Sequence, residues 1–158
     1  MNAGVEVAQG DILIFLHADT RFLCNIDELF RNTSVEVITW GRFDVELSRG
    51  HSLFKIIESC MNQRSRFTGV ATGDQTIFVT RDLFKKVEAF PSIPLMEDIE
   101  LSKILKLQCA PICFREKVIT SSRRWEEQGI IRAIIKIWWF RLKYALGINP
   151  AALAREYD

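Results

Sequence analysis

Short apolar runs alternate along this chain with stretches in which apolar residues recur at helical spacing. Residues 12–17 open with consecutive apolar side chains, which is typical of a strand buried on both faces of a sheet. Residues 35–47 alternate and are rich in β-branched and aromatic side chains, which predicts one or two further strands. Residues 51–66 and 97–107 carry apolar positions at helical intervals, which predicts two amphipathic helices.

The same rules assign the rest of the chain, with glycine and proline marking the ends of elements. Further helices are predicted at 2–9, 26–31, 81–87 and 126–146, further strands at 76–80, 112–114 and 118–120, and a short final turn at Pro150. Alternation of strands and helices, without a linker or repeat, favours one α/β layered domain with a mostly parallel mixed sheet.

The composition fits an ordinary globular domain, with 158 residues of which 48% are hydrophobic. The 21 Lys and Arg nearly balance the 20 Asp and Glu, so nucleic acid is not an expected partner. Sparse cysteines and the lack of a leader pattern favour a cytoplasmic setting. Cys109 and Cys113 have a spacing that zinc ligands can have, but the chain has only 2 histidines to complete a site, which favours buried thiols.

An imidazole and an acid follow the first predicted strand, where α/β sheets commonly bind ligands. In an extended chain His17 and Asp19 point to the same side, and oxygen ligands suit Mg²⁺ or Mn²⁺. The pair therefore indicates a metal or phosphate site. The spacing is equally compatible with Asp19 capping the next turn and His17 being a hydrogen-bonded core group.

Two other acidic segments are candidates for chemistry. Glu97 and Asp98 begin the helix at 97–107, where the helix dipole stabilises ionised carboxylates by about 0.3–1 kcal/mol. An ionised acid in a crevice can act as a general base, although the residues by themselves favour an ordinary charge preference at a helix N-terminus with no function. Asp74 and Gln75 lie at a predicted loop–strand junction, where they could bind a hydroxyl-rich ligand.

Arg123, Arg124 and Trp125 combine two guanidinium groups with an indole. Guanidinium groups pair bidentately with phosphate, and an indole can stack on a ring or sugar face. The alternative is a basic surface patch with a half-buried Trp.

Several short segments occur in a characteristic order: 1–4 (MNAG), 10–11 (GD), 15–20 (FLHADT), 41–44 (GRFD), 61–66 (MNQRSR), 73–75 (GDQ), 96–102 (MEDIELS) and 123–125 (RRW). In this order they resemble the family 2 glycosyltransferases of the GT-A fold, in particular a bacterial branch associated with arsenosugar-type biosynthesis. The resemblance runs essentially from end to end.

The resemblance implies an inverting transfer from a nucleotide-sugar donor to an acceptor hydroxyl on a small molecule, a glycan or a lipid-linked compound. Residues 17–19 are similar to the D-x-D element, so Asp19 is expected to hold a divalent metal, Mn²⁺ or Mg²⁺, on the donor diphosphate. His17 replaces the usual first acid. Asp98, within the pair that it forms with Glu97, resembles the general base that deprotonates the acceptor.

The remaining roles follow from the same resemblance. Arg123, Arg124 and Trp125 resemble a Q-x-x-R-W element without its Gln, so the arginines are expected at the donor diphosphate and the indole at the acceptor. Asp74 and Gln75 correspond to acceptor-side positions.

Members of this family normally open with a strand–helix–strand segment that cradles the nucleoside, whereas this chain begins at the helix before the D-x-D strand. The resemblance therefore implies a partial, N-terminally truncated GT-A domain that lacks the first βαβ segment. We expect residues 12–17 to become a sheet edge and donor affinity to fall.

Residues 130–146 are strongly apolar and aromatic, and basic side chains interrupt them at Arg132, Lys136, Arg141 and Lys143. These charges argue against a membrane-spanning helix, while aromatic and basic residues together suit the headgroup region, here at the inner face of the membrane. Packing across the domain or against a partner, including a second copy in a homo-oligomer, is the alternative. The competing function is a catalytically inactive remnant that binds a membrane or a partner through this helix.

Overall fold

The computed structural model describes residues 1–33, 39–48, 52–127 and 129–157. The chain, which the sequence predicted to be one domain, divides into two compact units, of which the first contains Met1–Pro91 and Asp98–Ser121 and the second contains Ser92–Glu97 and Ser122–Asp158.

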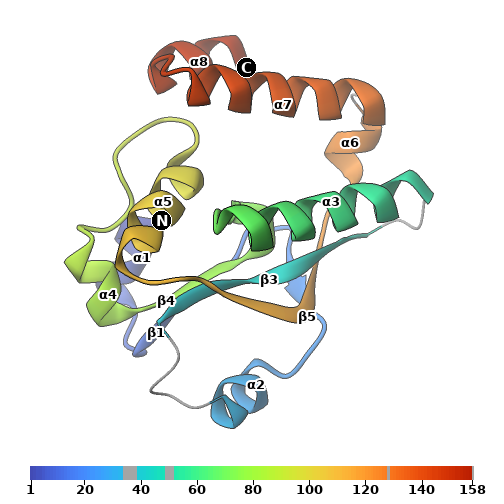
Figure 1. Ribbon diagram of the computed structural model, residues 1–158. Helices are drawn as coiled ribbons and strands as arrows, with labels where there is room; N and C mark the ends of the chain where they lie inside the picture. The colour runs from blue at the N-terminus through green and yellow to red at the C-terminus, as the bar shows by residue number, and fades with distance from the viewer. Residues whose placement is uncertain (34–38, 49–51, 128, 158) are drawn as a thin grey trace. The chain divides into compact units, whose positions relative to one another are not determined.

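Most helices and strands lie where the hydrophobic pattern predicts them, and Figure 1 labels them. In chain order they are α1 (Asn2–Val7), β1 (Ile12–Phe15), β2 (Arg21–Phe22), α2 (Ile26–Asn32), β3 (Trp40–Leu47), α3 (Ser52–Thr68), η1 (Gly73–Gln75), β4 (Ile77–Thr80), α4 (Arg81–Lys86), α5 (Glu97–Gln108), β5 (Ile112–Thr120), α6 (Arg123–Glu127), α7 (Ile130–Ala145) and α8 (Pro150–Tyr157). The part of the predicted strand at 35–38 lies outside the described residues.

The first unit contains a five-stranded mixed sheet in the order β1-β4-β3-β5-β2. Among the described residues only β3 and β5 pair in parallel, whereas β1–β4, β3–β4 and β2–β5 are antiparallel. The prediction of a mostly parallel sheet is therefore wrong. The connection that contains α3 joins β3 and β4, which are neighbouring antiparallel strands. Hydrophobic periodicity indicates which face of the sheet a side chain occupies, but it does not indicate the direction of the strand.

Strand β1 also differs from its prediction. It lies at one edge of the sheet and pairs with β4, which agrees with the expected sheet edge. The apolar run of β1 suggested burial on both faces of the sheet. Within β1, however, only Leu13 is buried, and Leu16, which directly follows the strand, is exposed. The edge position leaves one side of the strand without a neighbour, so fewer of its side chains are covered.

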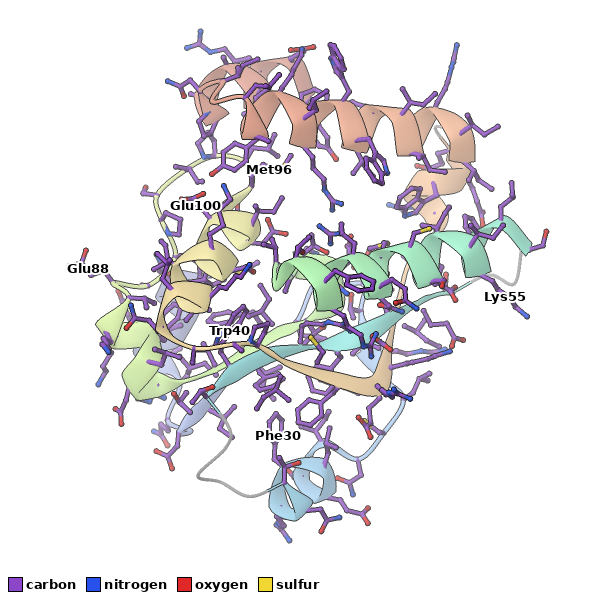
Figure 2. The ribbon with its side chains drawn as sticks, in the orientation of Figure 1. Phe30, Trp40, Lys55, Glu88, Met96 and Glu100 are labelled. Atoms are coloured by element: carbon purple, nitrogen blue, oxygen red, sulfur yellow. The ribbon has the colours of Figure 1, made fainter. Side chains whose placement is uncertain are left out.

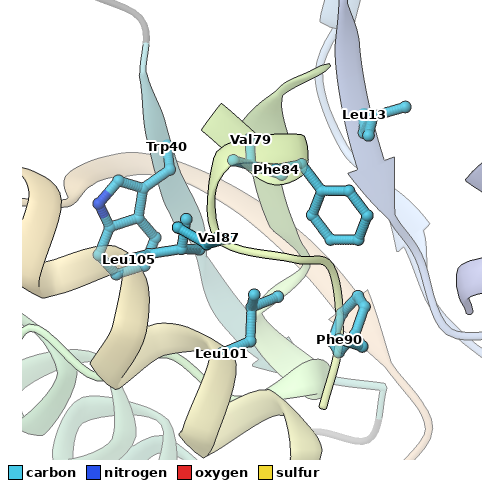
Figure 3. Close-up of a cluster of buried hydrophobic side chains, with 8 residues drawn as sticks. All are labelled: Leu13, Trp40, Val79, Phe84, Val87, Phe90, Leu101 and Leu105. Carbon is cyan, nitrogen blue, oxygen red and sulfur yellow. The ribbon is translucent and has the colours of Figure 1, made fainter. Parts of the chain in front are cut away.

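Two apolar layers cover the opposite faces of the sheet. On one face, α4 and α5 pack against β1, β3 and β4, and Figure 3 shows this cluster: Leu13, Trp40, Val79, Phe84, Val87, Phe90, Leu101 and Leu105. On the other face Phe30 reaches from α2 towards the sheet, where it meets Phe78 and Phe114 edge to face (Figure 2). The neighbouring residues Phe78 and Val79 thus enter opposite layers, as the period of a strand requires.

The second unit consists mainly of α6, α7 and α8. Gly129, at φ +79°, lies between α6 and α7, so the predicted helix at 126–146 is two helices rather than one. The predicted final turn is the helix α8, whose Tyr157 ring packs edge to face on Phe140 of α7, with ring centroids 5.2 Å apart. Among the described residues, no helix combines the length and the apolar character needed to cross a membrane.

Strand β5 also differs from its prediction. The short strands expected at 112–114 and 118–120 form one strand, β5, which pairs with β3 over most of its length. A register shift between Arg42 and Asp44 of β3 accommodates the polar middle of β5. Such a bulge re-aims the side chains beside it, and both of these residues are part of the site described below.

Candidate functional site

The end of β1 lies beside the start of β4. Phe15 is paired with Ile77, so the residues after β1 approach η1, the turn of 3₁₀-helix before β4. The imidazole of His17 lies against Gly73: a Cβ atom at this glycine would overlap Nε2 and would lie 2.7 Å from Cε1. The absence of a side chain at Gly73 therefore allows the ring to sit directly on the backbone.

Asp98 is attached to the same turn from the other side. Its Oδ2 accepts a hydrogen bond of 2.7 Å from the backbone N–H of Gly73, and its Oδ1 accepts one of 2.8 Å from the N–H of Ile99. Met96, with φ +67°, turns the chain immediately before α5. Both carboxylate oxygens are thereby fixed at the N-terminus of α5.

Three segments that are distant in the sequence thus meet at Gly73. The turn after β1 supplies His17, η1 supplies the glycine, and the start of α5 supplies Asp98. Each of these segments is also a candidate from its local sequence.

A buried polar network holds η1 in place. The amide nitrogen Nε2 of Gln75 donates to Ser65 Oγ at 2.9 Å and to Asn62 Oδ1 at 3.3 Å. Gln75 is fully buried, and its Oε1 has no hydrogen-bond partner among the described residues. Through these two hydrogen bonds the side chain of Gln75 supports the turn that carries Gly73. Its expected contact with the acceptor substrate stays a prediction.

The backbone beyond Gln75 is unusual. Thr76 has φ +51°, a conformation that is strained for a β-branched residue, and it directly precedes β4. Such residues persist only where the surrounding structure holds them, and they concentrate at binding and catalytic sites. The hydrogen bonds of Gln75 are part of what holds this one.

The network continues into a cluster of charged side chains on β3 and α3, of which Arg42 is buried and Asp44 and Arg66 are partly buried. Arg42, which is 1% exposed, forms an ion pair with Asp44 and donates from Nη2 to the backbone oxygen of Asn62 at 2.9 Å. Arg66 binds both oxygens of the Asp44 carboxylate, each at 2.9 Å. This hydrogen bonding raises the pKa of the Arg66 guanidinium above its ordinary value.

Asn62 connects the two parts of the network and also completes the sheet. Its Oδ1 accepts from the N–H of Val45 at 2.9 Å, and its Nδ2 donates to the Val45 carbonyl at 3.1 Å. Strand β4 pairs with β3 only as far as Arg42. Beyond that point the side chain of Asn62, from α3, supplies the hydrogen bonds to the backbone of Val45. No role was predicted for Arg42, Asp44 or Asn62. The available signal was the pair of opposite charges, Arg42 and Asp44, two positions apart in an apolar strand.

The structure corrects the expected relation between His17 and Asp19. Residues 17–20 form a turn in which the N–H of Thr20 donates to the carbonyl of His17 at 3.0 Å, so the two side chains do not project from an extended strand. Asp19 is exposed, and its Oδ1 accepts from the hydroxyl of Thr20 at 3.4 Å. Asp74 on η1 and Glu97 at the start of α5 are each partly buried.

A metal ion would have to rely on few protein ligands. Within the described ranges, no three His, Cys, Asp or Glu side chains are grouped so that they could hold one. Mg²⁺ at a diphosphate often takes only one or two carboxylates and completes its shell with phosphate oxygens and water. The exposed carboxylate of Asp19 fits that requirement, whereas the Nε2 of His17 is directed at Gly73.

The predicted donor-side and acceptor-side residues near the C-terminus belong to the second unit. They lie in α6, rather than ahead of a long helix as predicted. Arg123 is exposed and forms an ion pair with Glu127, with Nε and Oε1 3.5 Å apart. Trp125 is partly buried, and the side chain of Arg124 lies outside the described part of the structure.

Comparison of this chain with family models, with curated proteins and with solved structures found no match in any of the three.

Proposed function

We propose that this chain catalyses inverting glycosyl transfer from a nucleotide-sugar to an acceptor hydroxyl, with Asp98 as the general base. The observation that supports this proposal most directly is the meeting of His17, Gly73 and Asp98. Each comes from a segment on which the resemblance to family 2 glycosyltransferases rests, and these segments are far apart in the sequence.

The carboxylate of Asp98 is suited to accept a proton. Two backbone N–H groups orient it, and an ionised carboxylate offers about four lone-pair positions, so both oxygens can accept a further hydrogen bond. In the proposed step, Asp98 takes the proton of the acceptor hydroxyl as its oxygen forms a bond to the anomeric carbon. The bond from that carbon to the nucleoside diphosphate breaks, the diphosphate leaves with the electron pair, and the configuration inverts.

The donor side needs positive charge at the departing diphosphate. Arg123 and Arg124 are the proposed protein cations, and Asp19 is the proposed ligand of a divalent ion that, when bound, would neutralise the diphosphate. Asp74 and Trp125 are the proposed acceptor contacts. His17 is proposed to contact the donor while its Nε2 remains against Gly73.

A turnover assay tests the general base. Wild-type chain, Asp98→Asn and the control Glu100→Gln are incubated with Mn²⁺, acceptor sugars and a panel of UDP-, GDP-, dTDP- and ADP-sugars, and the released nucleoside diphosphate is measured. We expect turnover with at least one donor, a loss of about a hundredfold or more in Asp98→Asn, and wild-type rates in the control, which lies on the same helix.

Thermal unfolding separates binding from chemistry. A nucleoside diphosphate at about 100 times Kd stabilises the folded chain by about 2.7 kcal/mol, and we expect the same shift in wild type and Asp98→Asn but a smaller one in Asp19→Ala. Equal turnover by Asp98→Asn would remove the catalytic assignment. Absence of both turnover and a thermal shift with every nucleotide would remove the proposed function.

A further inference from the structure

Helix α7 exposes a continuous stripe of large apolar side chains. The stripe consists of Ile131, Ile135, Trp138, Trp139, Leu142 and Leu146, and each of these is at least 50% exposed. Positions separated by three, four and seven residues fall on one face of a helix. The opposite face carries the residues of α7 that are buried, Ala133 and Phe140, and Phe140 packs against α8.

Basic side chains border this stripe. Arg132 is exposed beside it, and the ammonium groups of Lys136 and Lys143 are fixed along the same border by contacts with α8. Lys136 donates to the carbonyl of Tyr157 at 2.8 Å, and Lys143 reaches both carboxylate oxygens of Glu156 at 2.6 Å. Helix α7 contains no acidic residue.

We infer that α7 lies on the surface of an anionic lipid bilayer, with the Ile131–Leu146 stripe inserted between the headgroups. Indole rings favour the boundary between headgroups and acyl chains, and basic side chains beside an apolar stripe pair with anionic headgroups. Since no helix in the described ranges is both long and apolar enough to cross a bilayer, the inferred position is at its surface. This inference is independent of the proposed transfer reaction.

The charge pattern favours lipid over a second copy of the chain. Pairing two copies through this stripe would bring the exposed Arg132 side chains towards one another, and α7 has no acid to compensate them, whereas Lys143 already has its counter-charge in Glu156 of α8. An anionic surface compensates the charge of Arg132 and adds about 1 kcal/mol per basic residue near it.

Flotation of the full chain with lipid vesicles tests this inference. We expect the chain to float with vesicles of phosphatidylglycerol and phosphatidylcholine in equal parts, and to float less with pure phosphatidylcholine or when salt is raised to about 1 M, where the Debye length falls to about 3 Å. In the variant carrying Trp138→Ala and Trp139→Ala, the partition coefficient should fall at least about tenfold, because interfacial binding scales with buried apolar area.

The matched control carries Phe67→Ala and Leu107→Ala, which remove two apolar side chains that are 85% and 84% exposed outside α7. This control should float like the wild type. Circular dichroism of each variant verifies that it is folded. The inference would be overturned if the variant with Trp138→Ala and Trp139→Ala floated as well as the wild type. It would also be overturned if the wild type did not float and instead formed a dimer in sedimentation that these two substitutions dissociate.

Discussion

Replacing Asp44 by Ala should destabilise the first unit strongly. The carboxylate of Asp44 is the ionic partner of Arg42, whose side chain is 1% exposed, and it also binds Arg66 through both oxygens. Without it, Arg42 keeps the hydrogen bond of 2.9 Å from Nη2 to the carbonyl of Asn62, but its charge is buried without a counter-charge. Removing one partner of a buried ion pair typically costs about 3–5 kcal/mol.

That cost is large compared with the stability of a domain, which is about 5–15 kcal/mol. For a slope of about 2 kcal/mol per molar urea, the loss from Asp44→Ala corresponds to a midpoint about 2 M lower. Urea unfolding followed by far-ultraviolet circular dichroism measures this shift. The exposed pair of Lys117 and Glu46 provides the control, because Glu46→Ala should cost about 1 kcal/mol or less.

A double variant examines the mechanism behind the expected loss. Arg42→Met combined with Asp44→Leu removes both charges, so it should recover much of the stability that Asp44→Ala loses. Arg66, which is partly exposed, can then turn to solvent. A cost below about 1 kcal/mol for Asp44→Ala would refute the reasoning, because it would mean that the charge of Arg42 is compensated by other groups.

Three further predictions follow from close packing and from a shifted pKa. Gly41→Ala should cost about 3 kcal/mol in urea unfolding, because its Cβ would overlap a backbone carbonyl oxygen of β5; a cost below about 0.5 kcal/mol would contradict this packing. Gly73→Ala should lower the free energy of unfolding by about 1–3 kcal/mol, because the new methyl group displaces the imidazole of His17. Adding His17→Ala should restore most of that loss. Strictly additive costs in a double-mutant cycle would disprove the contact. Burial and the nearby carboxylate of Glu116 raise the pKa of the Cys24 thiol, so iodoacetamide should alkylate Cys24 faster in Glu116→Gln at pH 8, as measured by mass spectrometry; an unchanged rate would argue against the influence of Glu116.

The hydrophobic pattern located most elements of the first unit, although it did not predict the two-residue strand β2 and divided β5 into two strands. Alternation along β4 sends Phe78 and Val79 to opposite layers, and helical spacing in α5 places Leu101 and Leu105 on one buried face. These properties depend on residues that are near one another in the chain, so they can be read from local sequence. Gly129 was an equally local signal for the break between α6 and α7, although the sequence analysis did not use it.

Strand direction and strand partners could not be read in the same way. Both a parallel and an antiparallel neighbour are compatible with the apolar run of β1, and the antiparallel pairing with β4 depends on contacts across more than sixty positions, as between Phe15 and Ile77. The expectation that His17 and Asp19 share one side failed for a similar reason. It assumed that the strand continues, whereas the chain turns after Phe15.

The candidate site illustrates the same division between local and distant information. Local sequence was enough to mark an acid at a helix start, Asp98, and a histidine after a strand, His17, as candidates. Their meeting at Gly73, and the burial of Gln75 beneath it, arise from tertiary contacts between segments that local patterns do not relate. Residue type and spacing specify which groups are available for chemistry, whereas the packing of distant segments fixes which of them face one another, because contact energies depend on position in space and not on separation along the chain.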